Sequence, residues 1–200
     1  MHRARSWVAS KQKILANLCD RVASPHVPKT DMTFLGWEQV YRLAEAHSER
    51  HRAMIYLAVD SGMRWSELIG LRRARLDLRT RNVRVTEQLI SLDDGAWVRK
   101  ELKTPSSVRS ITISPYTATR LAAHLERFSA AGTDGLVFPN AAGNPIASAS
   151  FWNNQFTPSL RRAGLLCRFH DLRHSSVALA IAEGAHPKAI QARMGPRRST

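Results

Sequence analysis

The spacing of apolar residues changes twice along this chain, and this change most limits the folds that the chain can adopt. Apolar residues recur at helical spacing in residues 37–44 and again in residues 51–61. Between residues 83 and 113 they alternate with polar residues instead, which is typical of half-buried strands. Helical spacing returns after residue 116. The pattern therefore predicts an α+β fold that is mostly helical and carries a small antiparallel sheet.

Glycines mark the ends of three of the predicted helices. Gly62, Gly184 and Gly195 each follow a helical pattern, and glycine is the usual residue just past a helix end because it adopts left-handed backbone angles without strain. Arg64 then opens a new short helix. The predicted helices cover residues 37–44, 51–61, 65–70, 116–128, 148–163, 170–183 and 187–194.

The predicted sheet has three antiparallel strands, at residues 83–85, 97–98 and 109–113. The run Asp93-Asp94-Gly95 is a turn signal directly before the second of them. Lys103 is expected near the end of that second strand.

The chain is predicted to divide near residue 30. Residues 8–23 have helical spacing but are too few to form a domain. Pro25 and Pro28 follow, and each disfavours helix at the residue before it, so residues 24–30 are expected to be an extended linker. The chain is therefore predicted to divide into residues 1–30, which are too few for a domain, and residues 31–200, which are predicted to form one domain.

The charge of the chain favours a polyanionic partner. Lysine and arginine number 30 against 16 acidic residues, which gives a formal net charge of +14. Double-stranded DNA is the partner that this surplus favours, although a merely basic soluble protein is the alternative. A membrane surface is less favoured, because no segment has the pattern of a basic amphipathic helix with an aromatic anchor.

Other sequence features indicate a cytoplasmic protein. No apolar run approaches the length of a membrane span, and the N-terminus lacks the apolar core of a signal peptide. Cys19 and Cys167 are far apart and in no metal-ligand spacing, so neither a disulfide framework nor a zinc site is expected.

Four residues are candidates for chemistry on a phosphodiester: Arg64, Lys103, His170 and Arg173. All can donate hydrogen bonds to phosphate oxygens. His170, Arg173 and His174 share one helix face in the first turns, where the positive helix end favours an anion. Taken singly, His170 and Arg173 could equally be solvent-exposed polar residues in the first turn of a helix. Arg64 and Glu67 could equally form an ordinary ion pair within a helix.

In this order the motifs resemble the tyrosine recombinase family, the phage integrases. The resemblance covers residues 31–198. It rests on Thr33-Phe34-Leu35, on Gly62-Met63-Arg64-Trp65-Ser66-Glu67-Leu68, on Leu102-Lys103-Thr104, on His170-Asp171-Leu172-Arg173-His174 and on Met194-Gly195. It implies the catalytic-domain fold of that family and site-specific recombination or integration of DNA through a phosphotyrosine link.

The resemblance also implies a role for each residue. Arg64 and Arg173 would bind the non-bridging phosphate oxygens in the transition state. Lys103 would protonate the leaving 5′ oxygen, and His170 would assist proton transfer at the nucleophile. Glu67 and His174 would hold the arginines and the helix in place. No metal or other cofactor is implied, and the partners would be double-stranded DNA and other recombinase subunits.

The sequence departs from the family pattern in three ways. The resemblance implies that residues 1–30 are a remnant of the family's N-terminal DNA-binding domain with its linker, so that domain is reduced here. The other two departures affect the expected activity. Pro196 follows Gly195, where the family has a histidine or tryptophan. The nucleophilic tyrosine is expected shortly after Arg198 but is not in this sequence, and Tyr41, Tyr56 and Tyr116 lie in other contexts. By itself the chain is therefore expected to be monomeric and unable to cleave DNA, unless a partner subunit supplies the tyrosine.

Two other functions were weighed against recombination. A non-catalytic DNA-binding remnant of an integrase is the main alternative. A metal-dependent nuclease is less favoured, because Glu67 and Asp171 do not form the carboxylate set that Mg²⁺ requires.

Overall fold

The structure, a computed structural model, describes residues 32–92, 94–102 and 107–195. These belong to one compact unit, Met32–Thr200. The helix and linker predicted within residues 1–30 lie outside the described residues, as do Lys103, Thr104 and Pro196. The division near residue 30 stays a prediction. Among the described helices, none combines the length and the apolar character needed to cross a membrane.

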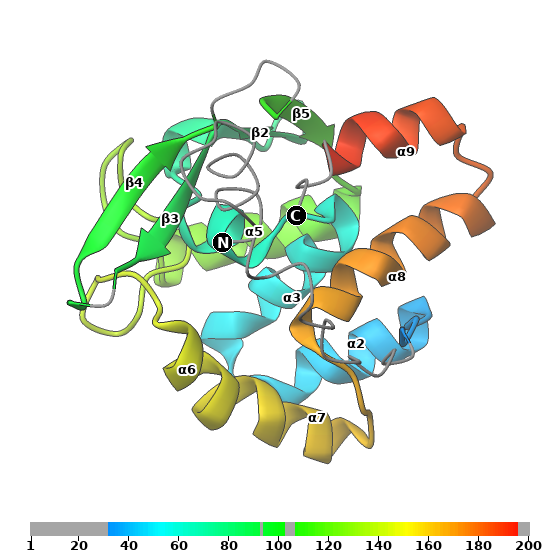
Figure 1. The fold of residues 1–200 in the computed structure, drawn as a ribbon, viewed down its shortest axis with the longest axis horizontal. Helices are drawn as coiled ribbons and strands as arrows, with labels where there is room; N and C mark the ends of the chain where they lie inside the picture. The colour runs from blue at the N-terminus through cyan, green and yellow to red at the C-terminus, as the bar shows by residue number, and fades with distance from the viewer. Residues whose placement is uncertain (1–31, 93, 103–106, 196–200) are drawn as a thin grey trace, which may run out of the picture. The chain divides into compact units, whose positions relative to one another are not determined.

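Helix α3 lies at the centre of the described unit. It covers Glu49–Ser61 and packs against α2 (Trp37–Ala46), α5 (Pro115–Arg127) and α8 (Phe169–Ala182) (Figure 1). Most of its residues are buried, including the whole run from Ala53 to Ser61, because helices cover it on several sides. Burial of this apolar surface is the main stabilising contribution to the unit.

The predicted start of α2 and the predicted end of α3 are confirmed. The Gln39 side chain accepts a hydrogen bond from the Gly36 N–H at 2.9 Å, which satisfies a donor that a helix start leaves without a partner. Gly62 ends α3 with a φ of +63°. Its left-handed conformation turns the chain so that Arg64 precedes α4 (Trp65–Ile69).

A three-stranded antiparallel sheet is present as predicted, but its strands differ from the prediction. Its order is β1 (Leu76–Asp77), β2 (Asn82–Val85) and β5 (Arg109–Thr112). The strand at Trp97 does not belong to it. That strand, β4 (Trp97–Glu101), pairs with β3 (Glu87–Ser91) in a separate two-stranded hairpin. Alternation identifies a strand but not its partner, because each strand can satisfy its backbone with any neighbour.

The helix predicted for residues 148–163 is continuous but contains one wide turn. α6 (Ser148–Phe151) and α7 (Thr157–Ala163) flank a π-helical turn, Trp152–Phe156. This turn brings Phe151 and Phe156, five positions apart, onto the same face with ring centroids 6.1 Å apart. Both rings are buried, so the irregular turn lets two aromatic side chains reach the core.

The last two helices follow the predicted limits closely. α8 begins at Phe169 and ends one residue before Glu183, and α9 covers Pro187–Met194 with Gly195 as its C-cap. Figure 1 shows α8 beside α3, and α9 beside the edge of the sheet near β5. The end of α3, the start of α4, the first turns of α8 and the end of α9 bring Arg64, Glu67 and Arg173 close together.

Candidate active site

Glu67 connects the start of α4 to Arg64. Its Oε2 accepts a hydrogen bond from the Arg64 backbone N–H at 2.8 Å, and its Oε1 accepts one from Arg64 Nη1 at 3.0 Å. The first bond caps the helix, because a glutamate at the third helical position can reach back to the residue before the helix. The second bond orients the guanidinium. The Arg64 side chain remains 21% exposed, so it is still accessible from solvent.

Arg109 binds the same carboxylate from β5. Its Nη2 donates to Glu67 Oε2 at 2.8 Å and its Nη1 donates to Glu67 Oε1 at 3.2 Å. The two side chains are 5% and 1% exposed. This bidentate ion pair is the strongest geometry available to an arginine and a carboxylate. Glu67 therefore lies between two arginines that come from different elements.

Arg173 reaches the same region from α8. Its guanidinium donates hydrogen bonds to the backbone carbonyls of Gly62 and Met194. These carbonyls belong to the C-terminal ends of α3 and α9, where helix dipoles carry partial negative charge and favour a cation. The bonds explain how a half-buried arginine is held at a fixed place between two helix ends.

The charges in this cluster interact strongly. Burial lowers the pKa of Arg173 to about 10, with a further lowering from the charge of Arg64 that Glu67 partly opposes. Burial by itself would raise the pKa of Glu67, but the hydrogen bonds and charge of Arg109, followed by those of Arg64, hold it below its usual value. Glu67 is thus ionised and binds two guanidinium groups, and its charge also acts on that of Arg173.

His170 and His174 lie one turn apart on α8. Their ring centroids are 5.0 Å apart. His170 is on the exposed side, and partial burial, together with the charges of His174 and Arg173, lowers its pKa. Asp171, between them in sequence, faces the other way: its Oδ2 accepts a hydrogen bond from the Arg168 N–H at 2.8 Å and caps α8.

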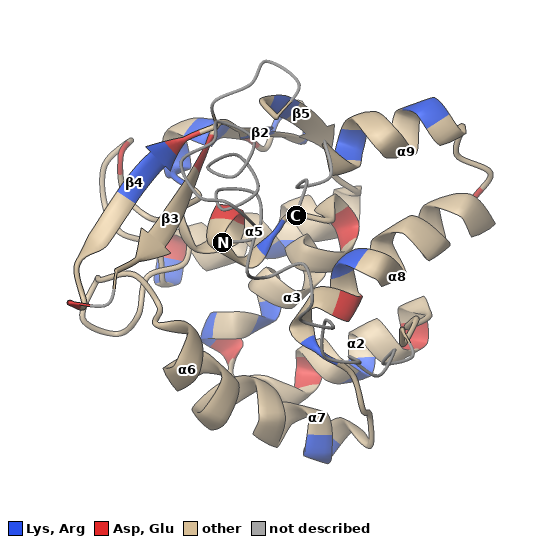
Figure 2. Cartoon of the chain, in the orientation of Figure 1, with Lys and Arg blue, Asp and Glu red and all other residues tan. Residues whose placement is uncertain are grey.

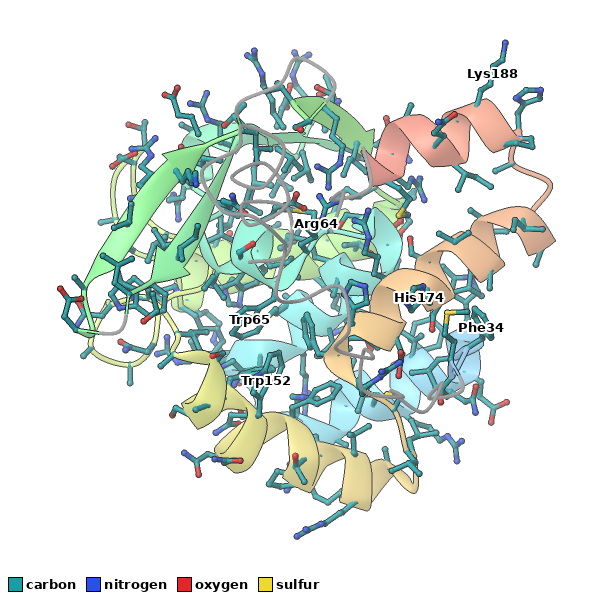
Figure 3. The ribbon with its side chains drawn as sticks, in the orientation of Figure 1. Phe34, Arg64, Trp65, Trp152, His174 and Lys188 are labelled. Atoms are coloured by element: carbon teal, nitrogen blue, oxygen red, sulfur yellow. The ribbon has the colours of Figure 1, made fainter. Side chains whose placement is uncertain are left out.

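A cluster of aromatic side chains packs around the first residue of α4, next to Arg64. Trp65, the residue after Arg64, lies with its ring centroid 4.5 Å from that of Trp152 and 5.2 Å from that of Phe169. Figure 3 shows Trp65 close to Trp152, with Arg64 above both in this view. Packing on both sides of Trp65 fixes the first turn of α4, and hence the direction from which Arg64 enters the site.

Lys103 lies outside the described residues, but the hairpin that leads to it is described. β4 ends at Glu101, and the Leu102 N–H donates to the Thr86 carbonyl at 3.0 Å. A second ion-pair network anchors the hairpin: Glu87 pairs with Arg99 at 2.7 Å and with Arg72 at 3.5 Å.

The family model described as "Phage integrase family" matches residues 33–199. The chain belongs to the phage integrase family. This confirms the resemblance and, with it, the expected fold class of a tyrosine recombinase catalytic domain.

Individual relatives agree with this family. The chain is 29% identical over 161 residues to a putative prophage phiRv2 integrase of Mycobacterium tuberculosis, an alignment that covers 79% of this chain and 42% of the relative. It is 27% identical over 202 residues to the integrase of Mycobacterium phage L5, with 96% and 53% covered. This integrase-family chain therefore spans about half the length of these curated relatives.

The fold also has solved counterparts. The Tn1549 transposon integrase, solved in complex with transposon right end DNA, superposes with a TM-score of 0.81 at 22% identity, covering 98% of this chain and 68% of that one. A lambda integrase dimer bound to a core site gives a TM-score of 0.61 at 15% identity, with 99% and 69% covered. These likenesses identify the fold.

The sequence reasoning did not single out Arg109 in this integrase-family chain. A signal was nevertheless present, because Arg109, Ile111 and Ile113 alternate along one strand and all three are buried. A charged residue in phase with the apolar face of a strand needs a buried partner. Glu67 is that partner.

Proposed function

We propose that this chain carries the phosphate-binding part of an enzyme that cuts and rejoins DNA at specific sites through a phosphotyrosine link. One observation carries the proposal: Arg64 and Arg109 both bind Glu67 in a partly buried site, and the charges of these three groups act on the Arg173 guanidinium beside them. The formal charge of this group is +2. A scissile phosphate, which carries negative charge that grows in the transition state, is the ligand that such a cluster favours.

The proposed roles follow from the chemistry of each side chain. Arg64 and Arg173 bind the non-bridging oxygens of the phosphate. Glu67 and His174 hold these two arginines and the helix in place. The lowered pKa of His170 keeps its imidazole neutral near neutral pH, so it can accept a proton from an attacking hydroxyl. Lys103, from the segment after β4, supplies the proton for the leaving oxygen. These steps involve no metal ion.

The attacking tyrosine is proposed to come from outside residues 32–195, either from the same protein or from a partner subunit. The three tyrosines of the sequence contact one another instead. Tyr41 and Tyr56 lie 5.8 Å apart between ring centroids, and Tyr116 lies 5.4 and 5.1 Å from them. Burial raises the pKa of Tyr56, and its hydroxyl donates to Glu45, which makes it a poor nucleophile.

Double-stranded DNA in the bacterial cytoplasm is the proposed substrate. The Tn1549 transposon integrase was solved in complex with transposon right end DNA, and the lambda integrase dimer was solved bound to a core site. Exposed basic residues support binding here as well, and Figure 2 shows basic residues on β4, near β5 and on α9. The exposed set includes Arg84, Arg99, Lys100 and Lys188. Charge on several elements at once fits contact along a DNA backbone.

A salt titration tests the phosphate site. The affinity for a fluorescein-labelled DNA duplex is measured by fluorescence anisotropy over a range of salt concentrations. Arg64→Ala and Arg173→Ala should each lower the slope of log affinity against log salt by about 1, the value of one phosphate contact. Arg73→Ala is the control, because Arg73 also donates to a helix-end carbonyl, that of Leu125 at 3.0 Å. Unchanged slopes in the first two variants would contradict the proposal.

A complementation assay separates the enzyme from the alternative of a non-catalytic DNA binder. The chain is mixed with a full-length family member whose equivalent of Arg64 has been replaced, and covalent protein–DNA adducts are counted on denaturing gels. Restored adducts support catalysis by this active site. DNA binding without restored adducts favours the non-catalytic alternative.

A further inference from the structure

Arg109 directs its guanidinium group at other residues of the protein. Its Nη1 and Nη2 donate to the two oxygens of Glu67, and its Nε donates to the Arg193 carbonyl at 2.6 Å. The side chain is 5% exposed. Each of its nitrogens is thus bound to the protein, so Arg109 acts on a ligand only through other residues.

The residue that Arg109 reaches through Nε belongs to the last turn of α9. No residue of α9 is buried, so the helix has little apolar attachment to the rest of the unit. Its C-terminal end is held by polar bonds instead: Arg109 binds the Arg193 carbonyl, Arg173 binds the Met194 carbonyl, and Arg193 Nη2 donates to the Thr112 carbonyl at 3.3 Å. Two arginines of the cluster therefore hold the C-terminal end of α9 in place.

The carboxylate oxygens of Glu67 accept hydrogen bonds from Arg64 as well as from Arg109. Glu67 Oε1 accepts from Nη1 of both arginines, at 3.0 Å for Arg64 and 3.2 Å for Arg109. A shift of the carboxylate that loosened one bond would change the other. The chain of contacts runs from the end of α9 through Arg109 and Glu67 to Arg64.

We propose that Arg109 is a positioning residue that links the position of the C-terminal end of α9 to the orientation of the Arg64 side chain. The proposal rests on the proposed function, in which Arg64 binds phosphate. Lysine cannot replace Arg109 in this role, because its single nitrogen cannot bridge both oxygens of Glu67 while also binding the Arg193 carbonyl. Arg109→Lys therefore keeps the charge and removes the linkage.

A double-mutant cycle on DNA affinity tests the linkage. The salt slope for a fluorescein-labelled duplex is measured for the original protein, Arg109→Lys, Arg64→Ala and the double variant. Arg109→Lys should lower the slope by about 1 in the original protein, because the Arg64 side chain is then no longer oriented toward the phosphate. In the Arg64→Ala background the same change should have no further effect. Arg73→Lys, at a half-buried arginine outside the cluster, should leave the slope unchanged in both backgrounds.

The outcomes separate the two proposals. An equal loss in both backgrounds would overturn the linkage, since Arg109 would then act by direct contact or by general destabilisation. No loss in the original background would overturn it as well. If Arg64→Ala by itself leaves the slope unchanged, the proposed function fails, and the linkage that rests on it fails with it.

A measurement on the unaltered protein covers the case in which Arg109→Lys does not fold. The Nε–H of Arg109 is followed by NMR hydrogen exchange, with and without duplex DNA. It should be protected from exchange in both states, because it is buried against the Arg193 carbonyl. Fast exchange in the protein without DNA would overturn the proposal. Glu67→Gln, which keeps the size of the side chain, should behave like Arg109→Lys: it should lower the salt slope in the original protein and leave it unchanged in the Arg64→Ala background.

Discussion

Arg173 on α8 donates a hydrogen bond to the backbone carbonyl of Gly62, which lies 111 positions earlier in the chain. A second bond joins it to Met194 on α9. The C-terminal ends of two helices thus meet at one guanidinium group, and their partial negative charges stabilise it. A residue proposed to bind phosphate is at the same time a connection between three helices.

Glu67 is expected to be important for stability as well as for the site. Glu67→Gln removes the buried negative charge between Arg64 and Arg109, and breaking a buried ion pair costs about 3–5 kcal/mol of unfolding free energy. Urea denaturation measures the loss. Asp134→Asn is the control: Asp134 also pairs with two arginines but is 70% exposed, so its loss should cost at most about 1 kcal/mol. Equal losses in both variants would contradict the expectation.

Acid is expected to destabilise the protein before its carboxylates are protonated. Burial lowers the pKa of His47 and of His51 from 6.5 to about 4. Because the unfolded chain binds these protons at a higher pH than the folded one, the contribution of each histidine is complete above pH 6.5 and is lost as the pH falls towards 4. The loss amounts to at most about 3 kcal/mol for each histidine.

Denaturation curves over this pH range check the histidine effect. Glu67 adds to the loss only at the acid end of this window, because its contribution begins to fall near the ordinary pKa of a carboxylate and is lost further as the pH drops below it. A variant with both His47→Gln and His51→Gln should show a flatter dependence of stability on pH, whatever its absolute stability. The same slope in the variant as in the original protein would assign the loss to other groups.

Two glycines with the same backbone angle should respond differently to alanine. Gly62 and Gly164 both have a φ of +63°, so alanine at either position costs about 1–2 kcal/mol in backbone strain. At Gly164 a new Cβ would meet nothing within 4 Å, whereas at Gly62 it would collide with the end of the Met194 side chain and lie 2.9 Å from its Sδ. Gly62→Ala should therefore cost about 1 kcal/mol more, because the flexible end of the Met194 side chain must move aside. Thermal unfolding of the two variants compares them directly.

Neighbouring serines on α8 provide a further comparison. Ser175 Oγ accepts a hydrogen bond from the Leu35 N–H at 2.9 Å and donates one to the Asp171 carbonyl at 2.8 Å. Ser176 Oγ is buried without a hydrogen-bond partner among the described residues. Ser175→Ala should cost about 1–3 kcal/mol, because it leaves a buried N–H unsatisfied, whereas Ser176→Ala should be neutral or stabilising. Chemical denaturation distinguishes them, and a larger loss for Ser176→Ala would contradict the assignment.

Much of the helical structure could be predicted from the sequence. The start of α2, the glycine after α3, the short helix after Arg64 and the limits of α8 and α9 depend on residues close in sequence, namely caps, prolines and apolar spacing. The π turn at Trp152–Phe156 was not predicted, because helical spacing alone does not reveal which aromatic side chains must share a face.

The sequence by itself determined which elements form and which residues are candidates for phosphate chemistry, because periodicity, capping and motif order are local properties. Only the tertiary structure decided that β4 pairs with β3, that Arg109 shares Glu67 with Arg64, and that Arg173 joins two helix ends. Glu67 and Arg109 are 42 positions apart. Such partners are chosen by packing: a buried charge takes whichever opposite charge the folded core brings within reach, and no local pattern specifies it.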